Sequence, residues 1–207
     1  MRILFTGVSP LFTKQFIDSF TTRWQNYTEG LESFTTPVDM VDINSQEEQW
    51  DSLNAIVDEL QTHRKGEHVY YLGGSLDNLI YSIWANAKNE NIDDDFIQKC
   101  MPIVSESMRF IDVIYYIPVS KYVATEVSSE YDEIRNLYTS VTQLWQEDSS
   151  PLFPKDDRPP IIELVGGVDE QLELMSLYMD EDGDAIGAQG IIDPGELEEL
   201  EKAFGIK

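Results

Sequence analysis

The chain has 207 residues, of which 42% are hydrophobic and 11% aromatic, so it can bury one sizeable core and is not a disordered polymer. Its 39 acidic and 14 basic residues give a formal net charge of −25, and we therefore expect no direct binding to nucleic acid or to a membrane. A single cysteine, Cys100, excludes an internal disulfide framework. No apolar run is long enough to cross a membrane, which predicts a soluble protein.

The first residues predict a buried strand that turns sharply into a helix. Ile3-Leu4-Phe5 is a short apolar run that ends at Thr6-Gly7. A helical pattern of apolar residues follows from Leu11 to Tyr27, and Glu29-Gly30 is expected to close that helix. A strand-to-helix turn of this kind is where α/β proteins place phosphate-binding loops.

The turn lacks most parts of a working P-loop. Counted from Gly7, the template G-x-x-x-x-G-K-[ST] requires a glycine, a lysine and a hydroxyl where this chain has Phe12, Thr13 and Lys14. Pro10 has no N–H to offer a phosphate. We expect no catalytic residues, and residual phosphate binding at the helix N-terminus is the alternative. The vestigial phosphate loop is predicted to consist of Gly7, Ser9, Thr13 and Lys14.

The rest of the sequence alternates between strand and helix patterns. Further strands are predicted at 37–43, 68–72, 111–117 and 160–165. Further helices are predicted from Asn44 or Ser45 to about His63, from Ser75, from about Asp93, at 128–145 and at 170–179. This order predicts an α/β three-layer sandwich, with helices on both faces of a mainly parallel five-stranded sheet.

The order of elements resembles the P-loop nucleotide kinases, and more narrowly the small AAA-type kinase-like proteins of tailed bacteriophages. The resemblance rests on the strand Ile3 to Gly7, the stretch Tyr70 to Tyr81, the strand Asp112 to Pro118 and the strand Ile161 to Val165. It covers residues 1–179 and implies a P-loop kinase-like domain there. It also implies a phage protein, located in the host cytoplasm or in the virion.

The sequence departs from active members of that family. Their third strand usually ends in an Asp-Arg pair, where this chain has Gly73 and Gly74. The lid region, Lys121 to Arg135, has few basic residues among its acids. Together with the missing loop residues, these departures remove the phosphate cradle, the metal placement and the charge stabilisation that phosphoryl transfer needs. The resemblance therefore implies a degenerate Walker A loop and no cofactor, with residual nucleotide and magnesium as the alternative.

Residues 180–207 are predicted to form an acidic linker and a short C-terminal helix. Asp180 to Asp184 resembles the start of a calcium loop, but Ala185 replaces the glycine needed at position six and Ile191 the glutamate needed at position twelve. We therefore expect a flexible linker, and weak calcium binding stays open. The terminal helix is expected either to fray or to bind a protein partner through Leu197, Leu200 and Phe204.

The leading hypothesis is a non-catalytic module that binds a protein or forms part of a virion. Its acidic surface favours a basic protein or a phage structural protein as the partner. One alternative is an active nucleotide or nucleoside kinase that uses Thr13 and Lys14 in an unorthodox loop. The other is an acidic DNA mimic that occupies a nucleic-acid-binding protein of the host.

Overall fold

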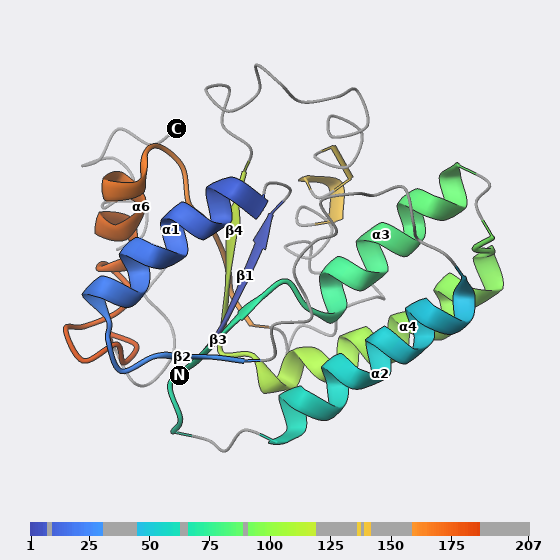
Figure 1. Cartoon of the computed structure of the whole chain (residues 1–207), viewed down its shortest axis with the longest axis horizontal. Coiled ribbons are helices and arrows are strands. Elements are labelled where there is room, and N and C mark those ends of the chain that lie inside the picture. The colour runs from blue at the N-terminus through green and yellow to red at the C-terminus, as the bar shows by residue number, and fades with distance from the viewer. Residues whose placement is uncertain are drawn as a thin grey trace.

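The computed structural model describes residues 1–7, 10–30, 45–62, 66–88, 91–118, 136–137, 139–141 and 159–186 (Figure 1). Strands and helices alternate along the chain. The strands are β1 (Arg2–Gly7), β2 (Thr28–Glu29), β3 (Val69–Leu72), β4 (Val113–Ile117) and β5 (Ile161–Glu163). The helices are α1 (Pro10–Arg23), α2 (Gln46–Thr62), α3 (Ser75–Ala87), α4 (Asp94–Ser107) and α6 (Val168–Met175), and a short 3-10 helix, Met108–Phe110, precedes β4.

The strands form one five-stranded sheet in the order β2-β3-β1-β4-β5, and every pairing is parallel. β1 is the central strand, with Leu4 opposite Tyr71 of β3 and Ile114 of β4. Parallel sheets are covered on both faces, which explains why β1 has a continuous apolar run in place of an alternating pattern. The predicted α/β fold with a mainly parallel five-stranded sheet is confirmed.

The helices form a layer on each face of the sheet (Figure 1). Ile3 and Phe5 of β1 pack with residues of α1 and α6, whereas Leu4 packs with residues of α2, α3 and α4. Successive side chains of a strand point to opposite faces, so one short strand supplies both hydrophobic cores. β1 therefore fixes the two helical layers relative to each other.

Phe5 is the centre of an aromatic cluster beneath α1. Its ring lies 5.3 Å from the ring of Phe16, 5.1 Å from that of Phe20 and 5.8 Å from that of Tyr115, measured between centroids. The ring of Tyr70 lies 6.2 Å away. These rings meet mostly edge to face, the arrangement that aromatic quadrupoles favour. The cluster joins β1 to the neighbouring strands and to α1.

Two of the predicted helix starts are capped as the sequence indicates. The Ser45 hydroxyl accepts the N–H of Glu48 at 3.2 Å and donates to the Glu48 carboxylate at 3.2 Å, so Ser45 caps the N-terminus of α2. Asp93 accepts the N–H of Phe96 at 2.8 Å and caps α4. That backbone hydrogen bond holds the pKa of the Asp93 carboxyl below its usual value.

The structure corrects the end of the first helix. α1 ends at Arg23, not near Tyr27, and Thr28–Glu29 forms the edge strand β2 next to β3. The predicted closure at Glu29-Gly30 is wrong because the N–H groups of Thr28 and Gly30 pair with carbonyl oxygens at and before β3. The strand expected at 37–43 lies outside the described residues. So does the helix expected at 128–145, except for helical residues 136–137 and 139–141.

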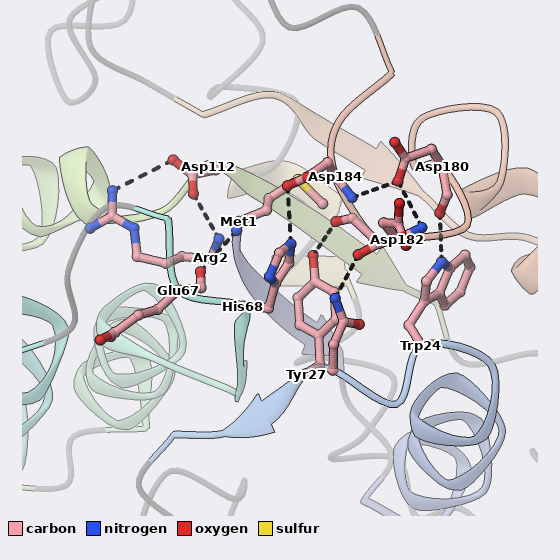
Figure 2. A network of polar contacts seen from close by, with 12 residues as sticks. Met1, Arg2, Trp24, Tyr27, Glu67, His68, Asp112, Asp180, Asp182 and Asp184 are labelled. Carbon is pink, nitrogen blue, oxygen red and sulfur yellow. Dashed lines mark hydrogen bonds and ion pairs between the residues drawn. The ribbon is translucent and has the colours of Figure 1, made fainter.

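Residues 180–186, which we call the acidic turn, are folded against the sheet domain (Figure 2). A β-bridge between Met179 and Ala185 closes the turn. Carbonyl groups of the turn accept hydrogen bonds from side chains at and after the end of α1. This corrects the flexible linker expected for these residues. The remainder of that linker, and the helix expected to carry Leu197, Leu200 and Phe204, lie outside the described residues.

We predict that Phe5→Ala lowers the free energy of unfolding by about 3–5 kcal/mol, because it removes the central ring of the aromatic cluster. The measurement is urea unfolding followed by circular dichroism. Phe5→Leu retains most of the apolar volume and should lose less. Phe110→Ala is the matched control at a partly buried position. A loss in Phe5→Ala no larger than that in Phe110→Ala would contradict the central role of Phe5.

Candidate functional site

The topology marks one edge of the sheet as the place for a ligand. Open α/β sheets bind ligands outside the carboxyl ends of their strands, where successive connections leave toward opposite faces. β1 continues into α1 on one face, and its neighbour β3 continues into α3 on the other (Figure 1). The candidate site is the carboxyl edge, which we define as Thr6-Gly7 together with residues 73–78.

Gly7 is the member of the predicted phosphate loop that the structure describes in full. It ends β1 opposite Ile117 of β4, and a Cβ atom at this position would clash with the carbonyl oxygen of Ile117. The close approach of the two strands therefore explains this glycine without a phosphate. Thr13 and Lys14 lie in the first turns of α1, but their side chains, like the whole of Ser9, fall outside what the structure describes.

Gly73 and Gly74, which follow β3, also have local structural reasons to be glycine. Gly73 has φ of +72° and donates its N–H to the carbonyl oxygen of Phe5 at 2.8 Å. A side chain would strain that conformation. A Cβ on Gly74 would lie 3.1 Å from a methyl group of Leu4. The turn after β3 is thus shaped by its contact with β1.

Asp77 places a buried carboxylate at the carboxyl edge. It is 5% exposed, and its Oδ1 atom accepts a hydrogen bond of 2.6 Å from the hydroxyl of Thr6, which is 2% exposed. Asp77 lies in the first turn of α3, where the helix dipole favours a negative charge. This contact ties the end of β1 to the start of α3.

The Thr6–Asp77 pair was not predicted from the sequence. The available signal is a hydroxyl directly after the apolar run Ile3-Leu4-Phe5, together with an acid in the first turn of a mostly apolar helix. That signal names two polar residues in buried elements but does not pair them. The pairing depends on β1 and β3 being neighbours, which is a property of the sheet order.

Other polar groups near this edge join helices to one another. The Asn78 amide donates to the Gln49 side chain at 2.9 Å and to the Gln49 carbonyl at 3.3 Å, which connects α3 with α2. The hydroxyls of Ser75 and Ser107 lie 2.7 Å apart and connect α3 with α4. These contacts hold the helices in place.

The described basic side chains are engaged away from the carboxyl edge. Arg2 pairs with Asp112 and Arg109 with Glu106. Three others lie over tryptophan rings at 3.9–5.8 Å from the ring centroid, namely Arg23 on Trp24, Lys88 on Trp84 and Lys99 on Trp50. α3 and the two glycines before it contain no lysine or arginine. The described part of this edge therefore has no cationic side chain that could bind a phosphate.

The described residues contain no group of three or more His, Cys, Asp or Glu side chains placed to hold a metal ion. A small pocket lies between α2 and the sheet, next to residues 73–75, and Leu4, Ile56 and Leu60 contribute apolar walls to it. Such a lining does not orient a polar ligand. Within the described ranges, no helix combines the length and the apolar character needed to span a membrane.

No family model matches the sequence, and no curated protein matches it. The chain is similar in structure to thymidylate kinase from Candida albicans, with a TM-score of 0.48 and 13% sequence identity. The superposition covers 90% of this chain and 94% of that chain. Values this low do not transfer a substrate or a reaction from that enzyme.

We predict that Thr6→Val lowers the free energy of unfolding by about 1–3 kcal/mol, because Asp77 stays buried without the hydroxyl that donates to it. Urea unfolding measures the change. Thr22→Val, at an exposed position of α1, is the control and should change stability by less than about 0.5 kcal/mol.

Asp77→Asn, added to Thr6→Val, should recover part of the loss, since a neutral amide costs less to bury than a carboxylate. Equal stability of Thr6→Val and Thr22→Val would show that the contact of Thr6 with Asp77 does not hold this edge together.

Proposed function

We propose that the chain is a non-catalytic, kinase-like α/β module with a degenerate Walker A loop, which binds a protein partner or forms part of a virion. The observation that carries the proposal is that the described residues of the carboxyl edge serve packing and hydrogen bonding within the fold. Gly7 and Gly74 are explained by close packing against Ile117 and Leu4, and Asp77 bonds to Thr6 inside the protein. The described groups at this edge thus have partners or packing reasons within the fold, which supports a module without phosphate chemistry.

The charge distribution supports a protein partner. The formal net charge is −25, and each described lysine and arginine side chain contacts an acid or a tryptophan of its own chain. Exposed acids such as Glu47, Asp51 and Asp94 remain turned to solvent. A field of this sign attracts a basic surface and repels nucleic acid. The phage origin, in the host cytoplasm or the virion, rests on the resemblance in element order.

We predict no saturable binding of ATP, GTP or a deoxynucleoside triphosphate in the presence of magnesium. Isothermal titration calorimetry of the full chain measures this directly. Lys14→Ala tests the lysine of the predicted loop, and Lys88→Ala, whose side chain lies over Trp84, is its matched control. Micromolar binding that Lys14→Ala abolishes and Lys88→Ala keeps would overturn the proposal in favour of an active nucleotide or nucleoside kinase.

We predict that a protein partner is captured from a bacterial lysate at about 50 mM salt and released at about 300 mM, because salt screens charge attraction between exposed groups. The immobilised full chain is compared with an unrelated protein of similar net charge, which removes generic binders. Duplex DNA should not displace the captured protein. Displacement by DNA would favour the DNA-mimic alternative, and the absence of any specific partner would contradict the binding module.

A further inference from the structure

α2 and α4 lie side by side on one face of the sheet (Figure 1). Trp50, in the second turn of α2, meets Phe96, in the first turn of α4, with ring centroids 6.3 Å apart and the rings edge to face. Phe96 is buried, whereas Trp50 is only partly buried. The junction of the two helices therefore presents an aromatic ring that groups from outside can reach.

The Trp50 ring already holds a cation. The Nζ atom of Lys99 lies 3.9 Å from the ring centroid, a shorter distance than in the other described contacts between a cation and a tryptophan. The quadrupole of an indole ring attracts an ammonium or guanidinium group placed over its face. Lys99 is exposed, and its ammonium sits on a flexible, strongly hydrated side chain, so another cation can take its place.

The side of α2 next to this ring is acidic. Glu47, Asp51 and Asp58 are exposed and follow one another after four and seven residues, so they lie on one face of the helix. α2 contains no lysine or arginine, and no ion pair joins these acids to a basic side chain of the described residues.

These acids do not stabilise the helix that carries them. The helix dipole favours a negative charge at Glu47 in the first turn, but its effect does not extend to Asp51 or Asp58. Glu47 and Asp51 are four residues apart, where like charges repel each other. Folding therefore accounts for little of this acidic stripe, and binding of a positive partner is the physical reason that fits it.

We propose that the Trp50 ring and the stripe of Glu47, Asp51 and Asp58 bind the basic partner, and that an arginine of the partner displaces Lys99 from the ring. The inference rests on the proposed function as a protein-binding module. Arginine suits the ring better than lysine, because its planar guanidinium stacks on aromatic faces and is more weakly hydrated. A second copy of this chain, with a formal net charge of −25, would be repelled.

Titration of the isotope-labelled full chain with a short poly-arginine peptide, followed by NMR at about 50 mM salt, tests this surface. The largest shift changes should fall on the amides from Glu47 to Asp58 and on the Trp50 indole. A poly-lysine peptide of the same length should bind about two- to fivefold more weakly, and Trp50→Leu should remove this preference. Shift changes spread evenly over the acidic surface would overturn the inference.

Two neutral double variants locate the charge that matters. Glu47→Gln with Asp51→Asn should weaken binding of the arginine peptide by at least about threefold, as expected for the loss of two exposed ion pairs. Asp169→Asn with Glu173→Gln is the matched control, because it removes two exposed acids with the same spacing from α6, on the other face of the sheet. Equal weakening in both variants would show that binding follows net charge alone and would contradict the proposed surface.

Lys99→Gln should have the opposite effect. It clears the ring for the incoming arginine and should tighten binding of the arginine peptide by about two- to fivefold. Arg23→Gln is the control, since it removes an equal charge from above Trp24, on the other face of the sheet. No tightening in Lys99→Gln, or equal tightening in both variants, would overturn the displacement. The lysate capture uses the wild-type chain alone, so it tests the proposed function separately from this surface.

Discussion

The pairing of β1 with β3 on one side and β4 on the other is the constraint on which the structure depends. It places Ile3 and Phe5 in one core and Leu4 in the other, so both helical layers are anchored to a single strand. The same pairing brings the end of β1 against Ile117 and explains Gly7. Because the strands are buried on both faces, little of β1 remains available for contact with a ligand.

Most of the fold could be predicted from local patterns. The apolar run at Ile3, the N-cap at Ser45 and the cap at Asp93 act within a few residues, and each is present in the structure. The end of α1 could not be predicted this way. Trp24 and Tyr27 continue the helical apolar spacing, yet their polar atoms bond to the acidic turn, which is 156 residues away in sequence.

The candidate site shows the same division between local and distant causes. The place of a possible phosphate loop and the residues it lacks could be predicted from the sequence, because these depend on spacing alone. The contact of Thr6 with Asp77 depends on strand order, and that of His68 with Asp184 on how a distant turn docks. Neither contact follows a fixed spacing in the sequence that could be recognised in advance. An acidic stretch that resembles a solvated linker can thus be a folded part of the domain.

The acidic turn is held in position mainly by its backbone and not by its charged side chains. Its carbonyl groups make three of the four docking contacts, and any residue supplies a carbonyl group. The side chains of Glu181 and Asp182 are exposed, so their identity is free to drift without moving the turn. Gly183, whose φ is +79°, and the carboxylate of Asp180, which accepts the N–H groups of Asp182 and Asp184, have no such freedom. Related chains should therefore keep these two residues while Glu181 and Asp182 vary between them.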